Sequence, residues 1–150
     1  MQCTVKWAGT ASNPSNPEQS SGMRFDAHTG SGHITSMDGA PEGGGNNLAP
    51  RPMELVLAGT GGCTAYDVVL ILKRGRQNVT GCDVQLTAKR ADVDPKVFTE
   101  IHMQFTVTGK GLNTATVERA VALSHEKYCS ASIMLAHSVT ITHAVTVEEG

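Results

Sequence analysis

The sequence predicts an α+β fold, in which strands and helices are segregated along the chain. Several segments alternate apolar and polar residues, which is the period of half-buried strands. One stretch of about 20 residues is apolar on every face, as buried helices are. We expect one domain that spans all 150 residues. Its predicted parts are N-terminal strands in 1–38, a Gly-rich connector in 39–52, a central helix in 52–74, and strands and helices in 79–149.

The central helix has clear start and stop signals. Pro52 suits the first turn of a helix, where a missing N–H costs nothing, and Gly75 suits the stop after two basic residues. A membrane span also needs about 20 apolar residues. Glu54, Asp67 and the run of small or polar residues at 59–62 argue against that alternative, because charges inside a bilayer are costly.

The N-terminal region predicts three strands. Residues 1–8 alternate, which places Cys3, Val5 and Trp7 on one face that we expect to be core. Residues 9–22 are rich in Ser, Asn and Pro and are predicted to be a loop of low order. Two short strands, 23–29 and 33–38, flank a turn and predict a hairpin.

Two longer strands follow the central helix. Residues 79–91 and 97–109 alternate, so each is expected to have one inward and one outward face. The predicted inward residues are Cys82, Val84, Leu86 and Ala88 in the first strand, and Ile101, Met103, Phe105 and Val107 in the second.

The C-terminal region predicts two helices and a closing strand. Asn113 can cap a helix that runs from 114 to about 127, because its side chain accepts from free N–H groups of the first turn. A short helix at 131–135 is expected to be capped by Ser130, and 138–148 alternates as a strand.

An all-apolar helix is hard to bury in one small domain. The simplest solution is a dimer in which the helices of two chains pack together between two sheets. The flexible Gly-rich connector would let the N-terminal strands of one chain join the partner's sheet. This arrangement is a hypothesis from the pattern alone.

The composition excludes several classes of function. The chain has 12 basic and 14 acidic residues and only 4% aromatic residues, which argues against nucleic-acid binding. The connector lacks the Gly-Lys-Ser/Thr pattern of a phosphate-binding loop. No pair of histidines has the four-residue helical spacing of a metal site, so we expect no metal. The N-terminal segment alternates like a strand and not like a signal peptide, so we expect a cytoplasmic protein.

The four cysteines form no CxxC pair and no metal-binding knuckle. Cys129 precedes the short helix, whose N-terminal dipole would favour a thiolate. Cys63 lies within the long helix, and Asp67 on the same face would oppose its ionisation. A nucleophilic Cys63 therefore needs a cation from elsewhere, and both a packing role and a redox role remain open. Gly61 and Gly62 indicate a close approach of other atoms beside Cys63.

Two motifs resemble the OsmC/Ohr family. They are PMELVLAGTGGCTAYDVV, which contains Cys63, and SHEKYCSASIML, which contains Cys129. The connector DGAPEGGGNNLAP and the residues around both cysteines resemble the YhfA-like branch. The resemblance implies an OsmC-like fold, in which two antiparallel sheets wrap around central helices in an intertwined homodimer. It also implies a thiol-dependent peroxidase that reduces organic and other hydroperoxides in oxidative-stress defence.

The resemblance also implies site residues. Cys63 would form a sulfenic acid, Cys129 would resolve it as a disulfide, and a dithiol reductant of lipoyl type would regenerate the pair. No metal or organic cofactor is implied. The family's arginine and glutamate roles would fall on Arg24 and Glu54. The family's glutamate directly follows a proline, whereas Met53 follows Pro52 here. Glu54 lies nine residues from Cys63, which is about 13.5 Å along a helix.

Two alternatives keep the same scaffold without peroxidase turnover. In one, the interface cavity binds a small apolar or thiol-containing molecule. In the other, the cysteine pair is a redox sensor whose disulfide alters the dimer.

Overall fold

A computed structural model describes residues 1–9, 12–13, 16–20 and 22–150. The chain forms two compact units, Met1–Val56 and Leu57–Gly150. The α+β class is confirmed, with one three-stranded sheet and additional elements in each unit. That the two units act as one domain stays a prediction.

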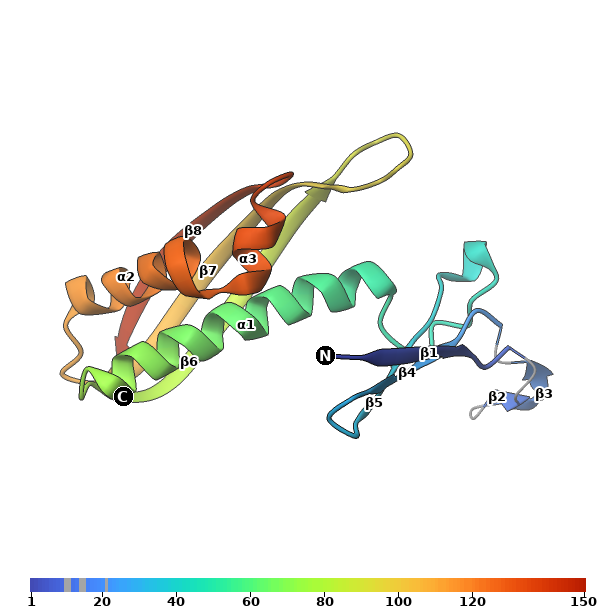
Figure 1. The fold of residues 1–150 in the computed structure, drawn as a ribbon, viewed down its shortest axis with the longest axis horizontal. Helices are drawn as coiled ribbons and strands as arrows, with labels where there is room; N and C mark the ends of the chain where they lie inside the picture. The colour runs from blue at the N-terminus through green and yellow to red at the C-terminus, as the bar shows by residue number, and fades with distance from the viewer. Residues whose placement is uncertain (10–11, 14–15, 21) are drawn as a thin grey trace. The chain divides into compact units, whose positions relative to one another are not determined.

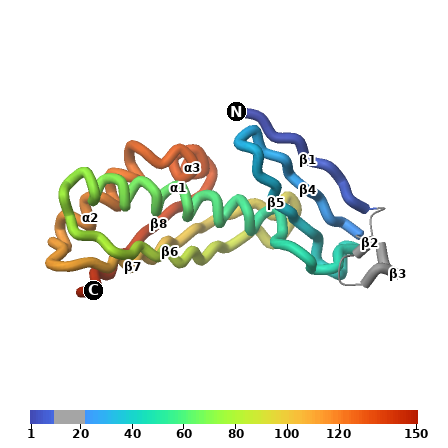
Figure 2. The backbone as a smooth tube through the Cα atoms, turned by 90° about the horizontal axis from the view of Figure 1, so that it is seen from below, coloured from blue at the N-terminus to red at the C-terminus, as the bar shows by residue number. Residues whose placement is uncertain are grey.

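The N-terminal unit is built on the antiparallel sheet β1-β4-β5, which can be followed in Figure 2. Its strands are β1 (Cys3–Trp7), β4 (Phe25–Thr29) and β5 (Ile34–Met37), and the predicted β4–β5 hairpin is confirmed. The predicted loop 9–22 contains the short strands β2 (Ser12–Asn13) and β3 (Asn16–Ser20). Residues 10–11, 14–15 and 21 of that loop lie outside the described residues.

The apolar face of β1 is not covered within this chain. Cys3 is exposed, Val5 is 55% exposed and Trp7 is 60% exposed. The prediction that these residues form core is therefore wrong for the single chain. The alternation identified the strand and its apolar face correctly, but the described residues supply no layer that buries this face.

The Gly-rich connector is an ordered loop built around Asp38. This carboxylate is 1% exposed and accepts hydrogen bonds from the backbone N–H groups of Gly39, Asn46 and Leu48. The three bonds hold the pKa of Asp38 below its ordinary value although burial acts in the opposite direction. A 3₁₀ turn, η1 (Pro41–Gly43), lies inside the loop. The flexibility of the connector stays a prediction.

The C-terminal unit contains the sheet β6-β7-β8. Strands β6 (Asn78–Arg90) and β7 (Phe98–Lys110) pair antiparallel, whereas β8 (Thr140–Glu149) pairs parallel to β7. The expectation of a purely antiparallel sheet is therefore wrong at this pair. The helices between β7 and β8 form the long crossover that a parallel pair requires.

Helices cover one face of this sheet (Figure 1). They are α1 (Pro52–Arg74), α2 (Thr114–Leu123), the π-helical turn η2 (Ser124–Tyr128) and α3 (Ser130–Leu135). Asn113 caps α2 by accepting from the N–H of Thr116, as predicted. The predicted inward face of β7 is confirmed. The buried core of this unit includes Val68, Leu72, Phe98, Ile101, Met103, Phe105, Val107, Val117, Ala120, Val121, Cys129 and Val139.

Helix α1 is buried along one stripe only. Its buried residues are Thr60, Gly61, Thr64, Val68 and Leu72, while Val56 and Tyr66 are 42% and 69% exposed. Among the described residues, α1 is the one helix whose length and apolar composition would suffice to cross a bilayer, a test that core helices of soluble proteins also pass. Among the described residues, α1 thus keeps an exposed apolar side that includes Tyr66.

Candidate functional site

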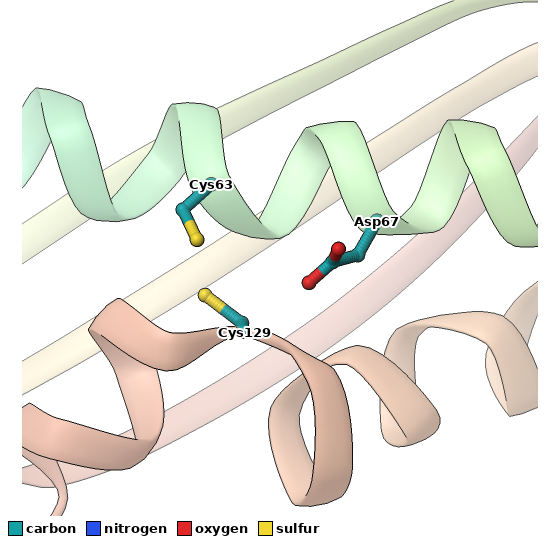
Figure 3. Close-up of side chains that lie close together, drawn as sticks. All are labelled: Cys63, Asp67 and Cys129. Atoms are coloured by element: carbon teal, nitrogen blue, oxygen red, sulfur yellow. The ribbon is translucent and has the colours of Figure 1, made fainter. Parts of the chain in front are cut away.

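Cys63 and Cys129 lie together in the C-terminal unit. Cys63 comes from the middle of α1 and Cys129 directly precedes α3, and their sulfur atoms point toward each other (Figure 3). The two sulfurs and one carboxylate oxygen of Asp67 all lie within 4.8 Å of one another. Cys129 is fully buried, whereas Cys63 and Asp67 are half-buried. The predicted pair of thiols is therefore brought within reach of a small side-chain movement.

The π-helical turn η2 positions Cys129. The N–H of Cys129 donates to the carbonyl of Ser124 over 2.8 Å, which is the i→i+5 bond of a π-helix. This wider turn places residues five apart almost one above the other. Ser124 and Cys129 are consequently both buried toward α1. Such single π turns occur often at functional sites.

The first turn of α3 supplies a backbone N–H to each sulfur. The N–H of Ser132 donates to Sγ of Cys129 over 3.4 Å, and the N–H of Ala131 donates to Cys63. The predicted cap of this helix was Ser130, but the structure shows Cys129 in the capping position. N–H donors favour a thiolate over a neutral thiol. One helical turn therefore offers a partner to both sulfurs of the pair.

A small hydroxyl network holds Asp67 beside the thiols. The hydroxyl of Ser124 donates to Oδ2 of Asp67 over 3.3 Å and lies 2.9 Å from the hydroxyl of Thr64. Thr64 and Ser124 are buried, and they connect α1 to η2. In the site, the sequence predicted for Asp67 the role of opposing ionisation of Cys63. Ser124 was not predicted, because nothing in the sequence marks a serine at a π turn.

The surroundings of Cys63 disfavour its thiolate. Burial raises the pKa of the Cys63 thiol, and Cys129 and Asp67 raise it further. The N–H of Ala131 acts in the opposite direction without reversing the rise. At neutral pH the thiol form therefore predominates in this environment.

The predicted close approach beside Cys63 occurs at Gly61. A Cβ atom added there would lie 2.5 Å from Cδ1 of Leu86 on β6, so glycine lets the helix lie close to the sheet. Gly62 has open space around its Cα and is exposed. An open hollow of about 410 Å³ lies along the same side of α1 as Gly62. It is lined by Gly62, Ala65, Tyr66, Val69, Leu70 and Lys73.

Glu54 and Arg24 have other partners within the N-terminal unit. Arg24 pairs with Asp26 at 3.1 Å. Glu54 accepts the backbone N–H of Arg51 over 2.9 Å and contacts its guanidinium at 3.4 Å. Because Arg51 directly precedes α1, this contact is the helix-capping bond of a third-position glutamate. The catalytic roles of Arg24 and Glu54 stay predictions.

The remaining thiols and the histidines are not members of this group of donors. Cys3 is exposed on β1, and Cys82 is half-buried on β6, as expected for an inert residue. His125 and His143 have ring centroids 5.5 Å apart, a pairing that no sequence pattern predicted. Within the described ranges, Cys63, Asp67 and Cys129 are the one group of three or more potential metal ligands.

Comparison with known proteins supplies further findings. Residues 43–144 match the family model described as OsmC-like protein. The protein YhfA of Escherichia coli strain K12 is 45% identical over 147 residues, which cover 98% of each chain. A hypothetical protein from Aquifex aeolicus VF5 is 28% identical, with a TM-score of 0.74 over 97% of this chain and 96% of that one. An organic hydroperoxide resistance protein OsmC from Legionella pneumophila is 18% identical and shares the fold, with a TM-score of 0.65 over 97% of each chain.

Proposed function

This chain belongs to the OsmC-like protein family, and from that premise we propose that it is a two-cysteine thiol peroxidase. Its substrates would be organic and other small hydroperoxides, and its role would be oxidative-stress defence in the cytoplasm. The observation that carries the proposal is the convergence of the Cys63 and Cys129 sulfurs (Figure 3). The name of the Legionella pneumophila neighbour, a hydroperoxide resistance protein, adds support.

The proposed reduction of a hydroperoxide has three steps. The Cys63 thiolate attacks the terminal peroxide oxygen, the O–O bond breaks, and the alcohol leaves with a proton, so Cys63 becomes a sulfenic acid. The Cys129 thiolate then attacks the Cys63 sulfur, the S–O bond breaks, and the hydroxyl leaves as water after protonation. A dithiol of lipoyl type reduces the disulfide by two electrons through thiol–disulfide exchange.

The proposed active form is an intertwined homodimer. Two exposed apolar surfaces among the described residues support it, namely one side of α1 and the face of β1. Burying such surfaces contributes roughly 25 cal/mol per Å² of apolar area. In the proposed homodimer, α1 and the N-terminal strands of a second copy would cover these two surfaces.

The peroxidase proposal requires a cation beside Cys63. The groups that face this thiol within the C-terminal unit raise its pKa in sum, so the thiolate needs a positive partner. Arg24 is the proposed source, and in the dimer it would leave its contact with Asp26.

A direct test treats the reduced protein with an alkyl hydroperoxide. We expect a Cys63–Cys129 disulfide, seen as the loss of two free thiols and as the linked peptides by mass spectrometry. Cys63→Ser should abolish peroxide consumption, and Cys129→Ser should leave a sulfenic acid that a dimedone-type reagent traps. Cys82→Ser is the matched control and should behave as wild type. Unchanged peroxide turnover in Cys63→Ser would end the proposal.

A second candidate function is favoured by the raised pKa of Cys63. On this account the scaffold binds a small apolar or thiol-containing molecule, or senses redox state, with little peroxidase turnover. It predicts that Cys63 in the assembled protein titrates at or above the free-thiol value of about 8.5. The peroxidase account predicts a value well below it. Alkylation rates measured across pH separate the two.

A further inference from the structure

We propose that the reduced Cys63, Asp67 and Cys129 form a binding site for a thiophilic divalent metal ion of the Zn²⁺ type. Two sulfur atoms and one carboxylate oxygen converge from α1 and the start of α3 (Figure 3). Metal binding itself is independent of the proposed peroxidase function. Only its consequence for turnover, described below, rests on that function.

The donor atoms fit the chemistry of zinc. Zn²⁺ binds cysteine sulfur at about 2.3 Å and carboxylate oxygen at about 2.0–2.2 Å, in tetrahedral geometry. Tetrahedral bonds of that length separate two sulfurs by about 3.8 Å. The three donors already lie within 4.8 Å of one another. Because the sulfur–oxygen separation in such a site is about 3.5 Å, they need to approach by about 1.3 Å at most. The fourth position would remain open to water.

Two of the donors sit on a rigid frame. Cys63 and Asp67 are four residues apart on α1 and therefore share one face of the helix. The same spacing in a pair of histidines is the usual helical metal signature. Here the donors are a thiol and a carboxylate, so a search for histidines overlooks them.

Surrounding groups orient the donors as outer-shell partners do in metal sites. The Ser124 hydroxyl donates to Oδ2 of Asp67, which leaves Oδ1 available to an ion. Each sulfur receives one backbone N–H from the first turn of α3, a bond that persists when the sulfur is a metal-bound thiolate. All donors are half-buried or buried, which restricts competition by water.

Charge compensation makes the site selective for the reduced state. With both thiols ionised, the cluster would hold three negative charges in a partly buried position. A divalent ion compensates two of these charges, and its binding releases the two thiol protons to solvent, so metal affinity should rise with pH. A disulfide carries no thiolate, and therefore the metal-bound and disulfide states exclude each other.

The test uses the reduced, full-length protein titrated with Co²⁺ and then with Zn²⁺ in the absence of oxygen. We expect one Co²⁺ per chain, with thiolate-to-cobalt charge-transfer bands and the visible spectrum of a tetrahedral site, and displacement by Zn²⁺. Zn²⁺ should also protect Cys63 from alkylation in the wild-type protein, located by peptide mass spectrometry. This second readout needs no variant and stays valid if a variant folds poorly.

Variants separate this cluster from other thiols. Cys63→Ser and Cys129→Ser should lose the charge-transfer bands. Asp67→Asn should weaken affinity by at least about tenfold, because even outer-shell partners contribute 10–100-fold. Cys82→Ser and Asp83→Asn are the controls and should bind as wild type. Absent charge-transfer bands, unprotected Cys63, or unchanged affinity in Asp67→Asn would overturn the proposal.

The metal site and the peroxidase fail independently. If Zn²⁺ binds but hydroperoxide forms no disulfide, the metal site stands and the proposed function falls. If a disulfide forms but no metal binds, the reverse holds. If both occur, one equivalent of Zn²⁺ should suppress peroxide turnover and a chelator should restore it.

Discussion

The hydroxyl groups of Thr64 and Ser124 lie 2.9 Å apart in the interior of the C-terminal unit. This contact joins the central helix to the π turn that leads into Cys129. The same Ser124 hydroxyl donates to Asp67, so one buried atom connects the helix packing to the thiol site.

Ser124→Ala should therefore destabilise the fold and loosen the site. We expect a loss of about 1–3 kcal/mol in the free energy of unfolding, because a buried Thr64 hydroxyl and the Asp67 carboxylate lose a partner. Denaturant unfolding measures the loss. Ser138→Ala removes an exposed hydroxyl and should stay within about 0.5 kcal/mol of wild type. An equal effect of both substitutions would contradict the role of Ser124.

Asp67→Asn should make Cys63 more acidic. Asp67 is one of the groups that raise the pKa of Cys63, so its removal should lower that pKa and increase the thiolate fraction at neutral pH. The alkylation rate of Cys63 should consequently rise, with its pH profile displaced toward lower pH. Asp83→Asn is the matched control, because Asp83 raises the pKa of Cys82 instead. A Cys63 profile that moves equally in both variants would refute the assignment.

Asp38 should make the N-terminal unit sensitive to acid. Its folded-state pKa lies below the ordinary value of about 3.9. Its contribution to stability is therefore fully present above that value and is lost as the pH falls through the lower folded-state pKa. The single tryptophan, Trp7, belongs to the same unit and can report the transition by fluorescence.

Asp38→Asn removes this contribution at every pH. We expect the variant to be less stable than wild type near neutrality and to depend less on pH below about 4. The exposed Asp92→Asn should leave the acid transition of Trp7 in place. If Asp38→Asn keeps the full acid dependence, the three backbone bonds to Asp38 do not control it.

Glu54→Gln distinguishes a capping role from a catalytic one. A glutamine oxygen can still accept the N–H of Arg51, so helix stability should change by less than about 0.5 kcal/mol. If Glu54 instead holds the proposed catalytic arginine, Arg24, beside Cys63, loss of its negative charge would free that arginine and lower peroxide turnover. If Glu54 only caps α1, hydroperoxide turnover should stay within twofold of wild type, which corresponds to about 0.4 kcal/mol. A loss of tenfold or more, with stability unchanged, would restore the catalytic role.

Periodicity made much of this fold predictable. The alternation in β7 marked Ile101, Met103 and Phe105 as inward residues, and all three are buried. Asn113 was recognisable as a cap because its short side chain can reach the free N–H groups of the first turn. These features are local, so the sequence near each residue contains the whole signal.

Features that depend on distant partners were not predictable in the same way. Nothing in β8 itself indicates that it pairs parallel to β7, since alternation is the same in both directions. The face of β1 was predicted to be buried, but burial depends on what covers a face as well as on the face itself. The residues of the η2 turn have no motif that indicates a π turn, so the helix was extended through it.

For the candidate site, the two thiols and Asp67 were identified from the sequence, but their hydrogen-bond partners were not. Cys63 and Cys129 stood out by their placement, while Ser124 and the N–H groups of Ala131 and Ser132 became visible only in three dimensions. Backbone donors have no sequence signature. A prediction of thiol reactivity from the sequence therefore omits these backbone donors.

The extra residue in the η2 turn determines whether Cys129 faces Cys63. A single deletion would therefore convert a scaffold that can form the disulfide into one that cannot. A one-codon deletion within Ser124–Tyr128 would convert the π turn to regular α-helix and rotate Cys129 by about 100° relative to the preceding helix. The partner thiol would then turn away from Cys63 while α2 and the sheet stayed in register. Homologues that differ in length at this turn should accordingly differ in whether their cysteines can pair.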